Sequence, residues 1–283
     1  MLQQTRVAVV RERYPDFIRR FPSVRSLARA PLPRVLAAWS GLGYYRRARN
    51  LHAAAKLVAG PGNFPCTAGD LRLLPGIGRY TAAAIASIAF GEPVAVVDGN
   101  VERVLGRMFA VSGAQCWSAA ETLLDPKSPG NFNQAMMELG ATICLPTSEP
   151  RCDECPVRRF CHFEKREGTN EKRFAKRRNR VRQHFLIARR GNCILLVRRN
   201  ASASLMPGMW ELPAARPRQT ASIRARHSIT NTDFDVSASL ASRAPCRHKG
   251  KWVHISRLSS FALTGLARKL LRQALPELAR QLK

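Results

Sequence analysis

The sequence is poor in acidic residues and has no long apolar run. Its 283 residues include 19 Asp and Glu against 47 Lys and Arg, so the formal net charge at pH 7 is +28. The longest apolar stretch, residues 81–90, is too short for a bilayer, which takes roughly 20 residues. Arginines also interrupt every candidate apolar core of a signal peptide near the N-terminus. We therefore expect a cytoplasmic protein with no membrane partner.

The apolar content is nevertheless sufficient for a folded core. Hydrophobic residues make up 45% of the chain, which excludes a wholly disordered protein. The isoelectric point near 11.3 favours a polyanionic partner such as nucleic acid. The length allows one large domain or two ordinary ones.

The chain divides into three regions by pattern. Residues 1–163 show apolar residues at helical spacing, which predicts a mainly α-helical domain. Residues 164–183 contain nine basic and three acidic residues and read as a linker, either a solvated tether or an arm that follows a phosphate backbone. Residues 184–283 change to short alternating runs, including two strands around a Gly191-Asn192 hairpin and an amphipathic helix over 263–282. The three regions carry net charges of +8, +6 and +14, so the last two should dominate non-specific binding to nucleic acid.

A glycine-rich turn precedes an alanine-rich helix in the first region. The segment reads LPGIGRYTAAAIASIAFG, with Gly76 and Gly78 in the turn. Such a turn presents bare backbone N–H groups to an anion. On this pattern alone, a purely structural turn is the preferred interpretation, and the anion-binding turn is the alternative.

A carboxylate follows about twenty residues later, in VVDGNVERVLGR. Asp98 stands directly before a predicted helix. It is a candidate catalytic group or an ordinary helix N-cap, for which aspartate is equally suited.

Four of the eight cysteines lie close together in the sequence. Their spacing is C-x7-C-x2-C-x5-C, and in a reducing compartment such clustering favours a metal centre over disulfides. Iron–sulfur cubanes take four thiolates. A zinc site is the alternative, although zinc ribbons generally use two separate C-x2-C pairs. The four residues are Cys144, Cys152, Cys155 and Cys161.

These motifs together identify a family. MLQQT, GLGYYRRARNL, LPGIGRYTA, VVDGNVERVL and FNQAMMELGATIC resemble adenine DNA glycosylases of the MutY type, which are helix-hairpin-helix enzymes with an iron–sulfur loop. The resemblance covers residues 1–163 densely and is weaker beyond the linker. It implies a mainly α glycosylase domain with a hairpin motif at about 71–90 and an iron–sulfur loop at 144–161. A smaller α/β Nudix-like domain, shortened, would occupy 184–283.

The resemblance assigns roles to residues of the first region. Gly76, Ile77 and Gly78 would grip a phosphate through backbone amides. Asp98 would stabilise the cationic sugar of a flipped adenosine. Tyr80 stands where related endonuclease III enzymes have the lysine that attacks the sugar, and a phenol has no amine for a Schiff base. A monofunctional glycosylase is therefore expected.

Residues near the N-terminus would contact the base pair. Gln3, Gln4 and Thr5 resemble the loop that lines the base pocket, and Tyr44 matches the aromatic residue that stacks beside the damaged guanine. Packing on a helix face is the alternative for Tyr44 and the preferred interpretation for Tyr45. Neighbouring arginines are expected at a solvated or phosphate-facing edge: Arg46, Arg47 and Arg49.

The family pattern also implies a [4Fe-4S] cluster on the four cysteines. This sequence has seven residues in the first gap where the family has six, which a bulge in a loop can absorb. In the second domain, Thr230 would donate its hydroxyl to 8-oxoguanine, while Asn231 stands in the place of a family histidine. Nothing resembles the acidic Nudix box, so no pyrophosphatase activity is expected.

The expected partner is double-stranded DNA with an A:8-oxoguanine or A:G mispair, bound by a monomer in the nucleoid. The family's general acid is a glutamate two residues before MLQQT, and the sequence starts at that methionine. The chain as given is therefore expected to bind the mispair and release adenine slowly. Two alternatives are a non-catalytic remnant that binds damaged DNA and, disfavoured by Tyr80, an endonuclease III type lyase.

Overall fold

The computed structural model describes residues 1–3, 5–60, 64–146, 149–163, 179–216, 223–229, 232–241 and 250–278. The chain forms two compact units, one made of Met1–Ala59 and Phe174–Lys283, the other of Gly60–Arg173. We call them the split unit and the central unit. Residues 1–59 are thus grouped with the C-terminal part, whereas the sequence pattern groups them with residues 60–163. No helix in the described ranges is long and apolar enough to span a membrane.

The central unit is helical. Helix α5 is a single turn capped by Thr67, whose hydroxyl accepts a hydrogen bond from the Asp70 amide, and the chain then turns into the alanine-rich helix α6. Its described elements are α5 (Ala68–Leu71), α6 (Arg79–Phe90), α7 (Gly99–Phe109), α8 (Ala114–Leu123), α9 (Pro129–Thr142), and the short 3-10 turns η1 (Cys152–Glu154) and η2 (Arg158–Phe160).

Helix α9 packs against both α6 and α7, and two glycines allow this. A Cβ at Gly130 would lie 2.8 Å from the Ser87 carbonyl oxygen of α6, and one at Gly140 would lie 2.6 Å from the Asn100 Cβ of α7. Any side chain at either position would therefore push the helices apart. Because α6 follows the hairpin and α7 follows Asp98, α9 sets the spacing of these two segments.

The N-terminal helices of the split unit pack around Trp39, which is 2% exposed. Phe17 and Phe21 contact each other edge to face, and Phe17 also meets the Trp39 ring in the same way. Met209 and Ala262 from the C-terminal part belong to the same apolar cluster. The helices are α1 (Val7–Arg20), α2 (Val24–Arg29), α3 (Leu32–Ala38) and α4 (Arg46–Val58).

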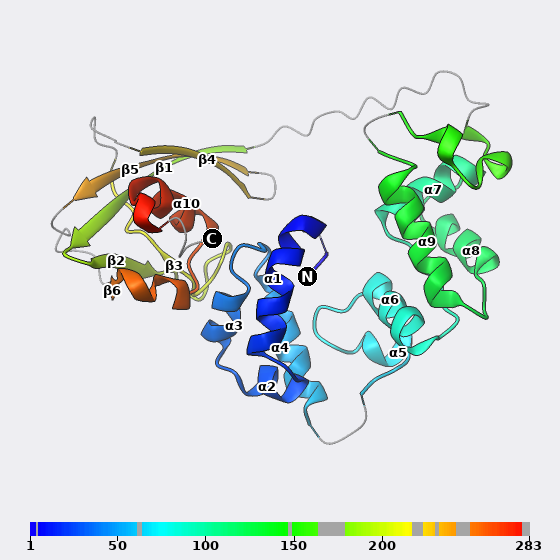
Figure 1. The fold of residues 1–283 in the computed structure, drawn as a ribbon, viewed down its shortest axis with the longest axis horizontal. Coiled ribbons are helices and arrows are strands. Elements are labelled where there is room, and N and C mark those ends of the chain that lie inside the picture. Colours follow the sequence, from blue (N-terminus) through cyan, green and yellow to red (C-terminus); the bar gives the residue numbers. More distant parts are fainter. Residues whose placement is uncertain are drawn as a thin grey trace. The chain divides into compact units, whose positions relative to one another are not determined.

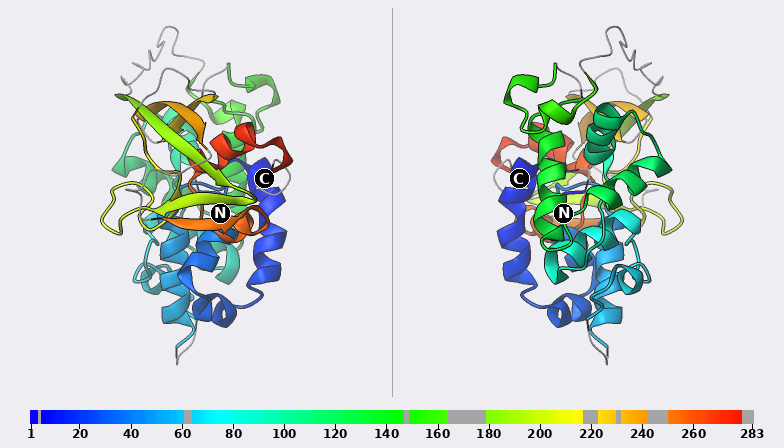
Figure 2. Two further views of the ribbon diagram at one scale, coloured as in Figure 1. Left: turned by 90° about the vertical axis from the view of Figure 1, so that its left-hand side faces the viewer. Right: turned by 90° about the vertical axis from the view of Figure 1, so that its right-hand side faces the viewer.

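The C-terminal part of the split unit contains a mixed sheet in the order β3-β2-β1-β5-β4, with β6 also paired to β2. Strands β1 and β5 run parallel and the other pairs are antiparallel. The sheet twists, as Figure 2 shows. Apolar residues of α10 pack on one sheet face (Figure 1). The elements are β1 (Asn179–Arg190), β2 (Cys193–Arg198), β3 (Trp210–Glu211), β4 (Ile223–Ile229), β5 (Thr232–Ala241), β6 (Lys251–His254), η4 (Ile255–Ser260), α10 (Gly265–Ala274) and η5 (Pro276–Leu278).

The predicted β-hairpin is confirmed, with Gly191 at a φ of 54° between β1 and β2. Strand β1 begins at Asn179, inside the segment expected to be linker, because it pairs with β5 along its length. The last helix is shorter than the expected 263–282: α10 ends at Ala274, just before Pro276, which cannot donate a hydrogen bond to a continuing helix.

Candidate active site

The glycine turn lies between α5 and α6 and forms a helix-hairpin-helix. Gly76 has a φ of 79°, a left-handed conformation that favours glycine. The amide of Ile77 donates to the Leu74 carbonyl at 3.2 Å, and the Ile77 side chain packs against the apolar cluster that contains Leu71. Gly78 is the exposed N-cap of α6, and among the described residues no side chain hydrogen-bonds at this cap. The hairpin therefore presents backbone to its surroundings, as an anion-binding turn requires.

Asp98 caps helix α7. Its Oδ1 accepts hydrogen bonds from the backbone amides of Asn100 and Val101, both at 2.8 Å. Its Oδ2 accepts one from the Asn100 side-chain amide at 3.2 Å. The N-cap interpretation of Asp98 is thus correct for the fold. The catalytic interpretation of Asp98 stays compatible with the cap, because the two amides hold the half-exposed carboxylate in one direction.

Tyr80 lies in the same neighbourhood, on the first turn of α6. Burial, and then the negative charge of Asp98, raise the pKa of the Tyr80 phenol above its ordinary value. The hydroxyl donates to Met137 Sδ at 3.7 Å. At neutral pH the phenol therefore stays protonated and uncharged beside the carboxylate.

A buried asparagine, not recognised from the sequence, fixes the segment that leads to Asp98. Asn133 of α9 is 1% exposed. Its Nδ2 donates to Ser87 Oγ at 3.0 Å and to the Val94 carbonyl at 2.9 Å, and its Oδ1 accepts from the Val96 amide at 3.1 Å. One side chain thus joins the hairpin helix to the chain two residues before Asp98.

Arg103 of α7 links the helix that Asp98 caps to the cysteine loop. Its Nε donates to the Cys144 carbonyl at 2.8 Å, and its Nη2 donates to Asn100 Oδ1 at 3.0 Å and to the Gly140 carbonyl at 2.6 Å. Because Asn100 also binds Asp98, the cysteine loop and the capped carboxylate share one hydrogen-bond chain. In the sequence this residue is one more arginine in VVDGNVERVLGR.

The four cysteines of the loop are all half-buried. Cys144, Cys155 and Cys161 pack against one apolar cluster, and Arg107 Nη1 donates to Cys144 Sγ at 3.1 Å. Within the described ranges, however, no three His, Cys, Asp or Glu side chains are grouped closely enough to hold a metal ion. The donor chemistry of four cysteine sulfurs fits a thiolate-bound centre.

The residues expected to contact the base pair lie in the split unit. Tyr44 is 48% exposed and has a φ of 45°, whereas Tyr45 is buried and its hydroxyl donates to the Leu263 carbonyl at 3.4 Å, so the packing interpretation of Tyr45 is confirmed. Gln3 is exposed, and Thr5 Oγ1 donates to the Leu42 carbonyl at 3.1 Å. Two expected contacts, Gln4 and Thr230, lie outside the described residues.

The neighbouring arginines were expected at a solvated or phosphate-facing edge, and two of them are not fully solvated. Arg46 is exposed. Arg47 is half-buried among backbone carbonyls, and Arg49 Nη2 donates to the Pro207 carbonyl at 2.5 Å. The Met1 and Pro207 carbonyls lie far away in the sequence, so the local RRAR pattern could not reveal these partners.

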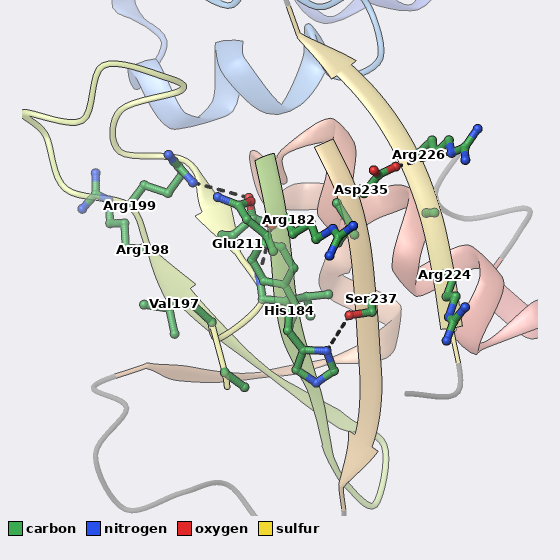
Figure 3. Close-up of a pocket in the computed structure, with 17 residues that line it drawn as sticks. Arg182, His184, Val197, Arg198, Arg199, Glu211, Arg224, Arg226, Asp235 and Ser237 are labelled. Carbon is green, nitrogen blue, oxygen red and sulfur yellow. Dashed lines mark hydrogen bonds and ion pairs between the residues drawn. The ribbon is translucent and has the colours of Figure 1, made fainter. Parts of the chain in front are cut away.

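A basic pocket of about 1290 Å³ lies on the C-terminal sheet (Figure 3). His184 Nδ1 and Ser237 Oγ share a hydrogen bond of 2.7 Å at its wall. Asp235 pairs with Arg226 Nε at 3.3 Å and remains partly exposed. The arginines that line the pocket come from several strands and the β2–β3 loop: Arg182, Arg198, Arg199, Arg224 and Arg226.

Glu211 lies deep in this pocket. Burial raises its pKa from 4.5 to about 7, against the lowering effects of the Thr264 and Leu212 hydrogen bonds and of Arg199. The Arg199 Nη1 atom lies 3.6 Å from Glu211 Oε2. No sequence pattern indicated this pocket, because its residues come from strands that meet only in the folded sheet.

Comparison with known proteins shows to which fold class the helical part belongs. Residues 1–127 match the model of the HhH-GPD superfamily base excision DNA repair protein. The structure is similar to that of a thermostable thymine-DNA glycosylase, with a TM-score of 0.54, 29% identity, and coverage of 58% of this chain and 80% of that one. It is also similar to endonuclease III in a non-covalent complex with DNA, with a TM-score of 0.51, 25% identity, and coverage of 57% and 78%. The helical part therefore has the HhH-GPD fold.

Within this class the sequence is similar to adenine DNA glycosylases. The human adenine DNA glycosylase is 49% identical over 177 residues, which are 59% of this chain and 32% of the human protein. The chain spans about a third of the length of the human, rat and mouse relatives. The resemblance read from the motifs is confirmed.

Proposed function

We propose that the protein is a monofunctional adenine DNA glycosylase of base excision repair, which removes adenine paired with 8-oxoguanine or guanine from duplex DNA. The observation that carries this proposal is the Asp98 carboxylate, held by the amides of α7 beside the uncharged Tyr80. The similarity to adenine DNA glycosylases supports the choice of base.

The chemistry follows from these two side chains. The bond between C1′ of the deoxyribose and N9 of adenine breaks, the adenine takes a proton as it leaves, and water adds to C1′. A carboxylate near C1′ stabilises the positive charge that develops on the sugar. Tyr80 has no amine with which to attack C1′, so no Schiff base forms and the strand stays intact after the base has left.

The proposal extends to the second half of the chain. A Nudix-like module would read 8-oxoguanine opposite the adenine, with Thr230 as one contact, and the arginines of the basic pocket would contact phosphates. The protein would act as a monomer on double-stranded DNA. The net charge of +14 on residues 184–283 supports this division of labour.

We also propose that Cys144, Cys152, Cys155 and Cys161 hold a [4Fe-4S] cluster, which in this loop would supply structural order. Three of these thiols border one apolar cluster, and Arg107 Nη1 donates to Cys144 Sγ, so the loop supplies four soft sulfur donors close to a cation. Cys155→Ser should lose the brown colour and the roughly four irons per chain of the purified protein. Cys66→Ser is the matched control, because Cys66 is exposed and outside the loop. A colourless protein with stoichiometric zinc would refute the cluster.

The substrate class is tested by base release from a panel of duplexes. Release is measured with the chain as given and with the chain preceded by a segment that carries a glutamate, here called the extended chain. We expect adenine release opposite 8-oxoguanine and guanine and little opposite thymine. Release of thymine opposite guanine, or equal adenine release from all pairs, would contradict the proposal. Selective binding without any release would favour a non-catalytic binding protein.

A further inference from the structure

Arg47 joins two loops of the split unit through backbone oxygens. Its Nη1 donates to the Met1 carbonyl at 2.8 Å and to the Gln3 carbonyl. Its Nη2 donates to the Leu42 carbonyl at 3.0 Å and to the Gly43 carbonyl at 3.3 Å. One guanidinium therefore connects the N-terminal loop, residues 1–5, to the loop that ends at Tyr44.

The same nitrogen, Arg47 Nη2, donates to Thr5 Oγ1 at 2.7 Å. Thr5 in turn donates to the Leu42 carbonyl, so the hydroxyl closes a small hydrogen-bonded ring between the loops. The planar fork of a guanidinium suits this set of acceptors. A lysine ammonium has its three donors on one atom and cannot reach the two separate groups of acceptors that Nη1 and Nη2 serve.

Arg47 also lies between two aromatic rings. Its Cζ is 5.5 Å from the centroid of the Trp39 ring and 5.5 Å from that of the Tyr44 ring. Trp39 is buried and its Nε1 donates to the Gly43 carbonyl at 3.1 Å. The guanidinium thus connects the exposed Tyr44 ring to the buried Trp39 ring, by contacts that depend on its flat cationic face.

Tyr44 requires such support. Its φ of 45° is uncommon for a residue with a Cβ, and a strained conformation persists only where its surroundings determine it. Its ring is 48% exposed, so core packing alone does not hold it. Among the described residues no carboxylate pairs with Arg47, which leaves its charge directed at carbonyls and rings.

We propose that Arg47 is a positioning residue that holds Tyr44 outward and fixes residues 1–5 beside it, so that both loops meet the damaged base pair preformed. This inference rests on the proposed function, in which Tyr44 stacks on the lesion and Gln3 and Thr5 line the base pocket. Preformed contacts cost less ordering on binding. Loss of the Arg47 contacts should therefore appear as weaker discrimination between duplexes.

The test compares Arg47→Lys with Arg46→Lys, an exposed neighbour on the same helix. The readout is the ratio of Kd for undamaged duplex to Kd for A:8-oxoguanine duplex. Arg47→Lys should lower this ratio about tenfold, the usual scale of one lost base stack, and Arg46→Lys should leave it unchanged. Added to Tyr44→Ala, Arg47→Lys should cause less than its full loss, because part of its effect acts through that ring. Additive losses would overturn the inference.

A second readout separates positioning from a direct phosphate contact. If Arg47 bound a phosphate, Arg47→Lys would keep the salt dependence of binding and Arg47→Met would reduce its slope by about 0.9. We expect both variants to keep the wild-type slope. A reduced slope in Arg47→Met with unchanged discrimination in Arg47→Lys would overturn the inference.

A third readout needs no DNA. Hydrogen exchange of the amides in residues 1–5 and 40–45 should become faster in Arg47→Lys, severalfold or more, and remain unchanged in Arg46→Lys. If the wild-type protein shows no preference for the mispair, the proposed function fails and exchange alone decides the inference. Unchanged exchange in Arg47→Lys would then overturn it.

Discussion

The central unit and the split unit hold their candidate functional groups in different ways. In the central unit, Asp98 is fixed by amides two and three residues further along its own chain, and the hairpin is fixed by a glycine conformation. In the split unit, Tyr44 and the N-terminal loop depend on Arg47, whose hydrogen bond to the Met1 carbonyl spans 46 residues. Local backbone geometry thus builds the proposed chemistry, whereas long-range contacts build the proposed recognition.

The comparison predicts that the proposed catalytic group can be changed without unfolding its unit. Asp98→Asn in the extended chain should reduce adenine release by at least about 10²-fold, because the amide cannot stabilise a sugar cation. Asparagine is as good an N-cap as aspartate, so stability should change little. Single-turnover release and thermal unfolding measure the two effects.

Asp98→Ala is the informative companion, because it removes both the charge and the cap. It should lose the same activity and, in addition, about 1 kcal/mol of stability. Equal release by Asp98→Asn and the unchanged extended chain would show that the carboxylate serves the helix alone.

Asn133 makes long-range hydrogen bonds in the central unit, and their loss should be severe. Asn133→Ala leaves the Val94 carbonyl and the Val96 amide without their buried partner. We expect a loss of about 2–4 kcal/mol in the free energy of unfolding, measured by chemical denaturation. The adjacent Gln134→Ala, at an exposed position, should cost under about 0.5 kcal/mol. A similar small cost for both would show that the network does not hold this segment.

Asn133 also shows what could be predicted from the sequence and what could not. The hairpin, the cap at Asp98 and the β1–β2 turn depend on residues within a few positions of one another, and they were predictable. The contact from Asn133 to Val96 spans 37 residues, and the Arg47 contacts and the basic pocket likewise join distant segments. No pattern in the chain specifies which polar side chain meets which carbonyl after folding.

In the split unit, the buried Glu211 should make stability depend on pH. Its folded-state pKa of about 7 lies above the ordinary 4.5, so the folded chain binds more protons than the unfolded chain between these values. Stability is therefore fully present below about pH 4.5 and falls by about 3 kcal/mol as the pH rises through 7. Glu211→Gln should flatten this decline in denaturation midpoints measured from pH 5 to 8. Glu277→Gln, at a half-exposed carboxylate, should not, and a decline that persists in Glu211→Gln would assign it to another group.

The basic pocket should contribute the smallest single effect. Arg224→Gln should lower the slope of log Kd against log salt by about 0.9 if this arginine contacts a phosphate. Arg20→Gln is the control, because Arg20 Nε already pairs with Asp16 at 2.9 Å. Fluorescence titrations at several salt concentrations measure the slopes. Equal slopes for both variants and the wild type would place the phosphate contacts elsewhere.

In the proposed mechanism, Asp98 and Tyr80 form a centre that releases adenine and leaves the strand intact. This mechanism is tested most directly by measuring free adenine and strand breaks in the same single-turnover reaction of the extended chain on an A:8-oxoguanine duplex, with borohydride trapping in a parallel sample. We predict stoichiometric adenine, strand breaks only after alkali, and no trapped protein–DNA adduct. Strand breaks without alkali together with a trapped adduct would contradict this account.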